Sequence, residues 1–168
     1  MSKKHKTPDK ELSSVNEPPA MYMNYSTANF FSKNAAIINP IPENLMTSFE
    51  KMNLLNVGLK KIHLENLKKR AHLDYDKLSQ ALSVTRATLI NKKGEEKYSE
   101  YVSERILALT ELYSYGYKVF QDEDNFNNWM FTPNQALAGK LPYDIVDNQF
   151  GREEIKNIIG RIEYGIFS

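Results

Sequence analysis

The chain has 168 residues, 41% of them apolar and 11% aromatic, which is enough to bury the core of one domain or of two small ones. No apolar run approaches the roughly 20 residues of a membrane span, and the start, MSKKHKTPDKEL, lacks the apolar stretch of a secretory signal. Cysteine is absent, which excludes disulfides, thiol catalysis and thiolate metal ligands. These features predict a cytoplasmic protein that does not bind membranes.

The net charge of +1 hides an uneven distribution along the chain. Residues 58–93 contain 9 basic and 3 acidic side chains, whereas residues 94–168 contain 7 basic and 13 acidic ones. A basic middle followed by an acidic end indicates two surfaces with two kinds of partner. The alternative is that ordinary solvated helix faces differ in sign by chance.

Residues 1–44 are predicted to form an N-terminal arm that is partly disordered or docked. Prolines interrupt every candidate element of this segment, at Pro8, Pro18, Pro19, Pro40 and Pro42. The stretch MYMNYSTANFF is too aromatic for a pure linker. Part of the arm is therefore expected to dock on the body of the protein or on a partner chain.

Residues 45–98 are predicted to form a helical domain that binds DNA. The stretch NLMTSFEKMNLLNVG places Leu45, Phe49 and Met52 on one helix face, and Gly58 can end that helix. Further along, Asp74 is a suitable N-cap for the helix in DYDKLSQAL.

A very short turn at Ser83 and Val84 separates that helix from a second, polar and basic one, SVTRATLINKK, which either Thr85 or Ser83 can cap. Two short helices joined in this way are typical of a helix-turn-helix, in which the first turn of the second helix faces base edges. The residues predicted to face the bases are Thr85, Arg86 and Thr88. Those predicted to contact phosphates are Lys92, Lys93 and the KKR run at 68–70. The alternative is an ordinary helical hairpin with an exposed basic end.

Residues 99–168 are predicted to form a second helical domain. Its first helix, YVSERILALTELYSYGYKVF, repeats apolar side chains at spacings of three and four, as a buried helix face does. The segment 129–155 then contains the only Trp of the chain with two Pro and two Gly, which predicts a compact wrap of short helices. In TPNQ, Thr132 is expected at an N-cap and Pro133 at the first helical position. Gly139 would end this short helix, and Pro142 would begin another.

The wrap is expected to pack through Trp129 and Leu137 on the long helix. The stretch DNQFGREE (147–154) is predicted to be a loop into a last helix, whose stripe of isoleucines, including Ile155, closes the domain. If the Trp129 ring is buried, Trp129→Ala should cost about 3–5 kcal/mol. Short helices depend on packing for their stability, so the wrap completes the core, presents a rigid acidic surface to another protein, or does both.

The order of these features is similar to that in the antitoxins of RES-type toxin–antitoxin operons, the Xre/MbcA/ParS group. The resemblance covers about residues 56–168. Upstream it includes the helix-turn-helix at 73–93 and the linking helix at 103–113. The matching C-terminal positions are Trp129-Met130, Pro133-Asn134, Ala136-Leu137, Gly139, Pro142-Tyr143-Asp144, Gly151 and Tyr164-Gly165. The chain departs from the family pattern at Met130, Ala138 and Tyr143, and at Ile90-Asn91-Lys92 in the second helix of the helix-turn-helix.

The resemblance implies a non-enzymatic type II antitoxin that acts without a cofactor. Its C-terminal domain would bind a cognate toxin that resembles ADP-ribosyltransferases and consumes NAD, and the complex, commonly built on an antitoxin homodimer, would repress its own operon by binding operator DNA. By position, the residues expected to contact the toxin are Asn134, Lys140, Asp144, Arg152, Glu153, Lys156, Tyr164 and Phe167. Those expected to hold the shape are Trp129, Pro133, Leu137, Gly139, Pro142, Gly151 and Ile155.

Two other classes of protein were weighed. A stand-alone dimeric helix-turn-helix repressor would have the same basic segment and would use its C-terminal domain only to dimerise. An enzyme is disfavoured, because the three His residues (5, 63 and 72) lack metal-ligand spacing, and the chain contains no Gly-rich phosphate loop or nucleophile motif.

Overall fold

The computed structural model describes residues 30–31 and 41–165, and over these residues the fold is all-α, as the sequence predicts. Apart from the helices, one isolated bridge pairs Lys60 with Lys97. The first half contains the 3₁₀ helix η2 (Glu43–Leu45) and helices α1 (Ser48–Val57), α2 (Lys61–Arg70), α3 (Tyr75–Ala81) and α4 (Arg86–Ile90). The second half contains α5 (Glu100–Phe120), α6 (Glu123–Met130), η3 (Gln135–Leu137), η4 (Pro142–Ile145) and α7 (Gln149–Glu163).

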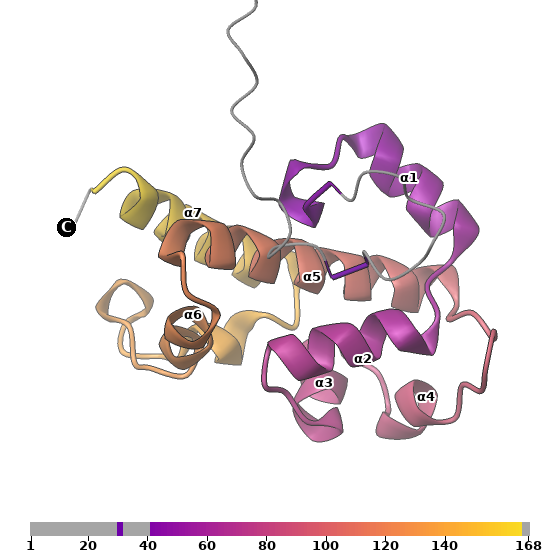
Figure 1. Cartoon of the computed structure of the whole chain (residues 1–168). Helices are drawn as coiled ribbons and strands as arrows, with labels where there is room; N and C mark the ends of the chain where they lie inside the picture. The colour runs from indigo at the N-terminus through magenta and orange to yellow at the C-terminus, as the bar shows by residue number, and fades with distance from the viewer. Residues whose placement is uncertain (1–29, 32–40, 166–168) are drawn as a thin grey trace, which may run out of the picture.

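Helix α5 runs through the middle of the molecule, between the α1–α4 half and the α6–α7 half (Figure 1). Ser99 caps it, accepting a hydrogen bond from the backbone N–H of Val102 at 3.4 Å. Its predicted apolar stripe is buried, including Ile106, Leu109 and Tyr113. The prediction of a long core helix is therefore confirmed, and this helix supplies core to both halves.

Helix α7 lies beside α5 and runs in the same direction. Near the middle of both helices, Lys156 pairs with Glu111 at 2.6 Å, and closer to their C-terminal ends Tyr115 donates to Glu163 at 2.7 Å. Ile155 faces the core with no exposed surface, as predicted. The start of α7 differs from the prediction, because the helix begins at Gln149 and not after the stretch DNQFGREE.

Helix α1 ends at Gly58, as predicted, but its apolar face does not enter the core. Thr47 and Glu50 form a capping box at its start, so Leu45 lies in η2, outside the helix. Leu45, Phe49 and Met52 are 46%, 70% and 59% exposed. The helix is thus held on the body by other contacts, and its stripe faces outward.

The predicted capping box at residues 132–135 is wrong. The N-cap of η3 is Asn134, whose side chain accepts from the N–H of Ala136 at 2.9 Å. Thr132 instead donates back to the carbonyl of Asn128 at 2.9 Å, at the end of α6. An Asn side chain two residues from the N–H competes successfully with Thr for the cap, because it closes a tight turn locally.

Two residues expected to hold the wrap's shape are more exposed than predicted. Pro133 is exposed, and Trp129 is half-buried, where its ring stacks on the buried Phe126 at 5.7 Å. Leu137 is half-buried. The short helix also ends one residue earlier than expected, because Ala138 adopts the left-handed conformation (φ 54°) ahead of Gly139 (φ 82°).

Two other residues that are expected to hold the shape, Pro142 and Gly151, lie in closely packed positions. Pro142 opens η4 and is buried. Gly151 lies within α7, where an added Cβ would come 1.6 Å from the carbonyl oxygen of Ile145, so only glycine allows η4 and α7 to approach this closely.

Candidate functional site

Helices α3 and α4 pack together as a helix-turn-helix requires. Asp74 caps α3 by accepting from the N–H of Lys77 at 2.7 Å, and Thr85 caps α4 by accepting from the N–H of Thr88 at 3.2 Å. Between them Ser83 adopts a left-handed conformation (φ 49°), which turns the chain within a few residues. The caps and the short turn predicted from the sequence are therefore present.

The first turn of α4 presents its polar side chains to solvent, where Thr85, Arg86 and Thr88 are exposed. Arg86 pairs with Asp76 of α3 at 3.2 Å, and both side chains are more than half exposed. Because an exposed ion pair contributes at most about 1 kcal/mol, Arg86 can exchange Asp76 for a nucleic-acid group at little cost. Lys93 is exposed and Lys92 is half-buried.

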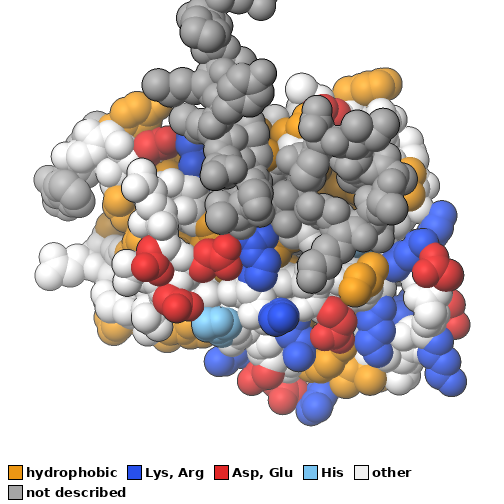
Figure 2. Space-filling model, viewed as in Figure 1, with side chains coloured by type: hydrophobic (Ala, Val, Ile, Leu, Met, Phe, Trp, Pro, Cys, Tyr) orange, Lys and Arg blue, Asp and Glu red, His pale blue; other side chains and the backbone are white. Residues whose placement is uncertain are grey.

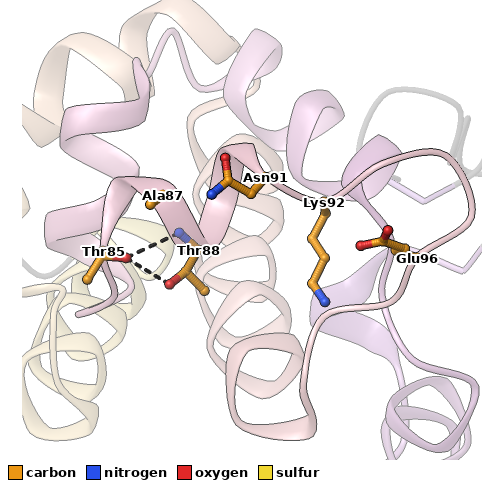
Figure 3. A pocket seen from close by; sticks show the side chains of 6 residues that line it. All are labelled: Thr85, Ala87, Thr88, Asn91, Lys92 and Glu96. Atoms are coloured by element: carbon orange, nitrogen blue, oxygen red, sulfur yellow. Dashed lines mark hydrogen bonds between the residues drawn. The ribbon is translucent and has the colours of Figure 1, made fainter.

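An open hollow of about 350 Å³ follows this face of α4 (Figure 3). Within it, the hydroxyls of Thr85 and Thr88 lie 2.8 Å apart. Figure 3 shows the Lys92 side chain extending from the segment after α4, on the side where Glu96 lies. The residues that line the hollow are Thr85, Ala87, Thr88, Asn91, Lys92 and Glu96. The hollow combines donors, acceptors and a cation, which suits contact with polar groups.

Basic side chains gather over this half of the molecule. Figure 2 shows most of its Lys and Arg side chains at the lower right, in the region of α2 to α4, with Asp and Glu interspersed among them and also further to the left. One member of the predicted phosphate-binding run is placed elsewhere: Arg70 pairs with Glu123 of α6 at 2.6 Å. Lys69 is exposed, and Lys68 lies over the Tyr75 ring at 5.3 Å.

The wrap between α6 and α7 is held by its own backbone. The N–H of Asn134 donates to the carbonyl of Lys140 at 3.0 Å, and the carbonyl of Asn134 accepts from Gly139 at 2.9 Å. Asp144 accepts from the N–H of Leu141 at 3.4 Å, at the start of η4. Of the predicted partner contacts here, Lys140 and Asp144 are exposed, whereas Asn134 is half-buried and shapes the turn.

The predicted contact residues of α7 divide between support and surface. Arg152 is half-buried and donates to the carbonyl of Val146 at 2.8 Å, and burial together with nearby Arg105 lowers its pKa from the usual range. Lys156 is tied to Glu111. Glu153 is exposed and accepts from Gln149 at 2.8 Å, and Tyr164 is 78% exposed. Phe167 lies outside the described residues.

The two halves are joined at the base of α7. Arg105 of α5 donates to the carbonyl of Leu82, in the turn between α3 and α4, at 3.2 Å, and to that of Asp147 at 3.0 Å. Ser83 also donates to Asp147, at 3.2 Å. Tyr143 of η4 donates to the carbonyl of Lys77 in α3 at 2.7 Å. The wrap and the segment after it therefore contact α3 and the turn between α3 and α4 directly.

Comparison with known proteins places the second half in a family. Residues 116–165, from the end of α5 through α7, match the model of the antitoxin Xre/MbcA/ParS C-terminal toxin-binding domain. Residues 116–165, here named the antitoxin domain, are therefore similar to the Xre/MbcA/ParS toxin-binding domain. The resemblance found in the sequence is confirmed.

Similar proteins include Antitoxin Xre of Photorhabdus laumondii, 32% identical over 76 residues, which are 45% of this chain and 51% of that protein. Antitoxin Xre of Yersinia enterocolitica is 26% identical over 85 residues, 50% of this chain and 57% of that protein. The Prs ADP-ribosylating antitoxin of a Sphingobium species is 25% identical over 130 residues, 71% and 81% of the two chains. The match therefore spans about half the length of each Xre relative.

The antitoxin domain carries one exposed residue that the sequence analysis missed. Phe150, in the first turn of α7, is 80% exposed, more than the other exposed large apolar side chains of the described residues. Phe150 is close in sequence to the residues that were expected to contact the toxin. Because residues 147–154 were predicted to be a loop, Phe150 was not assigned to an exposed helix face. Because Phe150 lies in α7, its side chain projects in a defined direction, from the outer side of the helix.

The described residues contain neither a metal-ligand cluster nor a membrane-spanning helix. Among them, no three His, Asp or Glu side chains gather as a metal ion would require. No described helix is both long enough and apolar enough to cross a bilayer.

Proposed function

We propose that this protein is a type II antitoxin that binds and neutralises a cognate RES-type toxin, an ADP-ribosyltransferase-like, NAD-consuming enzyme. The observation that carries the proposal is the match of residues 116–165 to the antitoxin toxin-binding domain. The name of the Sphingobium relative, which couples an antitoxin with ADP-ribosylation, supports the class of toxin. The proposed activity is binding without catalysis or a cofactor, in the cytoplasm.

The proposed toxin-binding surface is the outer side of the wrap and of α7. Lys140, Asp144 and Glu153 offer exposed charges, and Phe150 and Tyr164 offer aromatic anchors. Aromatic residues dominate the binding energy of many protein interfaces. The hydrogen bonds of Asn134, Arg152 and Lys156 to their own chain hold this surface in shape, so that little conformational entropy is lost when a partner docks.

We propose further that α3 and α4 bind the operator of the protein's own operon and repress it. The exposed Thr85, Arg86 and Thr88 on α4 support base contacts, and Lys92 and Lys93 support phosphate contacts. The domains are proposed as an arm at 1–44, a DNA-binding domain at 45–98 and a toxin-binding domain at 99–168, with α5 packing against both halves.

The proposed antitoxin acts as a homodimer, and α1 is the proposed interface. Phe49 and Met52 of α1, together with Leu45 of η2, present exposed apolar side chains, and no residue of α1 is buried. A symmetric dimer would cover the same stripe on both copies, and helix-turn-helix proteins commonly read two half-sites with two copies.

The decisive experiment is co-purification with the product of the adjacent gene. The two proteins are expressed together, purified by a tag on this chain, and the partner's NAD consumption is measured with and without it. A stable complex with suppressed NAD loss is expected. Specific DNA binding without a partner or suppression would instead support a stand-alone dimeric repressor.

A matched pair of variants locates the two surfaces. Phe150→Asp and Phe49→Asp each place a carboxylate on an exposed aromatic position, 80% and 70% exposed, on different helices. Phe150→Asp should weaken toxin binding at least about tenfold and leave the oligomeric state unchanged. Phe49→Asp should give a monomer by light scattering and leave toxin binding intact. The opposite pattern would contradict both assignments.

A further inference from the structure

The arm residues Phe30 and Phe31 lie in a pocket that the proposed function does not use. Both side chains are only 1% exposed. These two residues of the predicted arm therefore pack on the body, while residues 1–29 and 32–40 lie outside the described residues. The pocket is built by η2, α2 and α5, and it recognises the backbone of these two residues as well as their rings.

The backbone of the pair is bound by two polar side chains. The N–H groups of Phe30 and Phe31 both donate to one carboxyl oxygen of Glu43, at 2.8 and 3.2 Å, and Glu43 has no exposed surface. The side-chain amide of Asn66 donates to the carbonyl of Phe30 at 3.0 Å. Ser114 of α5 donates to Asn44 at 2.8 Å and so fixes η2, which carries Glu43.

Aromatic and cationic groups bind the two rings. Phe30 stacks on Tyr117 of α5 with ring centroids 5.6 Å apart, and Phe31 meets His63 of α2 edge-on at 5.2 Å. The guanidinium of Arg70 lies 4.0 Å from the centre of the Phe30 ring. A segment with only one of the two aromatic rings would lose the contacts that the other ring makes.

The same Arg70 also connects α2 to α6, the helix that precedes the wrap. Its guanidinium binds the Glu123 carboxylate with two nitrogens, at 2.6 and 3.3 Å. Its carbonyl accepts from the side-chain amide of Asn127 at 2.8 Å, and the Tyr117 hydroxyl donates to it at 2.9 Å. A ring at the Phe30 position therefore packs on the group that holds α6 in place.

We propose that this pocket is a peptide-binding site for a segment that bends at two consecutive aromatic residues, filled here by the chain's own Phe30 and Phe31, and that filling it locks α6 onto α2. Specificity comes from the paired N–H groups on Glu43, the carbonyl on Asn66 and the two rings. The site is independent of a toxin and of DNA.

The first test supplies the ligand in trans. A fluorescein-labelled peptide of residues 26–35, STANFFSKNA, is titrated by fluorescence polarisation into the full chain and into a full chain carrying Phe30→Ala and Phe31→Ala. The variant should bind, whereas the unmodified chain, whose site is filled intramolecularly at high effective concentration, should bind at least about tenfold more weakly. A peptide with both Phe replaced by Ala is the control and should not bind.

Two substitutions of Glu43, each made in the chain that carries Phe30→Ala and Phe31→Ala, form a matched pair. Glu43→Leu removes the acceptor and should weaken the peptide by roughly tenfold or more, because both N–H groups lose their partner. Glu43→Gln keeps an oxygen acceptor and should retain most of the binding. The proposal would be overturned if the Phe30→Ala/Phe31→Ala chain has a native far-UV circular dichroism spectrum but does not bind the peptide.

The second test keeps both rings and so does not depend on how well the double variant folds. Amide hydrogen exchange is measured in the unmodified chain and in Asn66→Ala. The N–H groups of Phe30 and Phe31 should be protected in the former, and both they and α6 should exchange at least about threefold faster in the latter. Unprotected Phe30 and Phe31 amides in the unmodified chain, or α6 exchange that Asn66→Ala leaves unchanged, would reject the lock.

Discussion

At the scale of single residues, Glu43 is the least expected feature of the molecule. Burial raises the pKa of its carboxyl to about 7, although the N–H groups of Glu43 itself, Phe30 and Phe31 and the charge of Arg70 oppose the shift. Its Oε2 is buried and has no hydrogen-bond partner among the described residues, so this oxygen can carry the proton while Oε1 accepts the two N–H groups. Near neutral pH the group is thus close to half protonated.

This arrangement predicts a distinct dependence of stability on pH. Because the folded pKa lies above the unfolded value, the contribution of Glu43 is fully present below about pH 4.5 and is lost as the pH rises through about 7. The loss is on the order of 3 kcal/mol. Glu43→Gln, which is neutral throughout, should remove this part of the pH dependence. Urea denaturation of both chains between pH 4 and 8 measures the difference.

The control for this prediction is Glu50→Gln in the capping box of α1. Hydrogen bonds from Thr47 lower the pKa of Glu50, so its contribution is present above about pH 4.5 and is lost toward acid, the opposite sign. Comparing each variant with the unmodified chain separates these groups from His63, whose pKa burial lowers. A Glu43→Gln difference that stays constant from pH 4 to 8 would show that Glu43 does not titrate in this range.

At the scale of elements, the proposed DNA recognition is tested by substitutions in α4 and directly after it. Arg86→Ala together with Lys92→Ala should weaken operator binding by about 1–3 kcal/mol and reduce the salt slope by roughly one to two, because a base contact and a phosphate contact are both removed. Binding is measured by gel shift across a salt series on the operon's own promoter.

The matched control for α4 removes the same charge elsewhere. Lys118→Ala with Arg161→Ala deletes two cations from α5 and α7, on surfaces outside the helix-turn-helix. This pair should leave operator affinity almost unchanged. Equal effects of the two pairs would mean that binding senses only net charge and would remove the role of α4.

Helix α6 differs from the prediction in which of its aromatic side chains is buried. The sequence predicts Trp129 as the buried ring, because Trp is the largest side chain of the segment. The structure buries Phe126 instead, at 0% exposure, and half-buries Trp129 beside it. Gly116 makes this possible, since a Cβ there would lie 2.2 Å from the Phe126 ring. A close approach across two helices leaves no periodic signal in either segment.

The two rings should therefore differ in their effect on stability. Phe126→Ala should cost about 3–5 kcal/mol through the cavity it leaves. Trp129→Ala should cost about 1–2 kcal/mol, because part of the ring stays in water and only its stacking is lost. Urea denaturation followed by far-UV circular dichroism measures both. Equal losses would contradict the half-buried position of Trp129.

Prediction from sequence succeeded where one local rule decides the outcome and failed where distant segments compete. The N-caps at Asp74 and Thr85 depend on residues three positions apart, and both are present. The early start of α7 depends on Asn148, which accepts from the N–H of Gly151 at 3.0 Å, and on the room that Gly151 leaves for η4. The pocket for Phe30 and Phe31 joins residues 12 to 87 positions apart, so no window of the sequence contains it.

At the scale of the whole molecule, the two proposed domains share one core. The buried cluster contains Leu64, Leu78 and Leu89 of the helix-turn-helix half together with Phe126, Ile155 and Ile159 of the antitoxin domain. Arg105 adds polar contacts between the halves, because its guanidinium donates to carbonyls of both. The described body is therefore expected to unfold in one transition, although the proposed functions divide it in two.

The last prediction tests this cooperativity through Arg105. In the unmodified chain, urea curves from Trp129 fluorescence, which reports on the antitoxin domain, and from far-UV circular dichroism should coincide. Arg105→Met keeps much of the side-chain volume but leaves the carbonyls of Leu82 and Asp147 without this donor, so it should cost about 1–3 kcal/mol. Arg161→Met, whose contact is a 3.8 Å pair with Glu154 at the surface, should cost less than about 1 kcal/mol. Two separated transitions in the unmodified chain would mean that the halves fold independently, and that the contacts of Arg105 do not couple them.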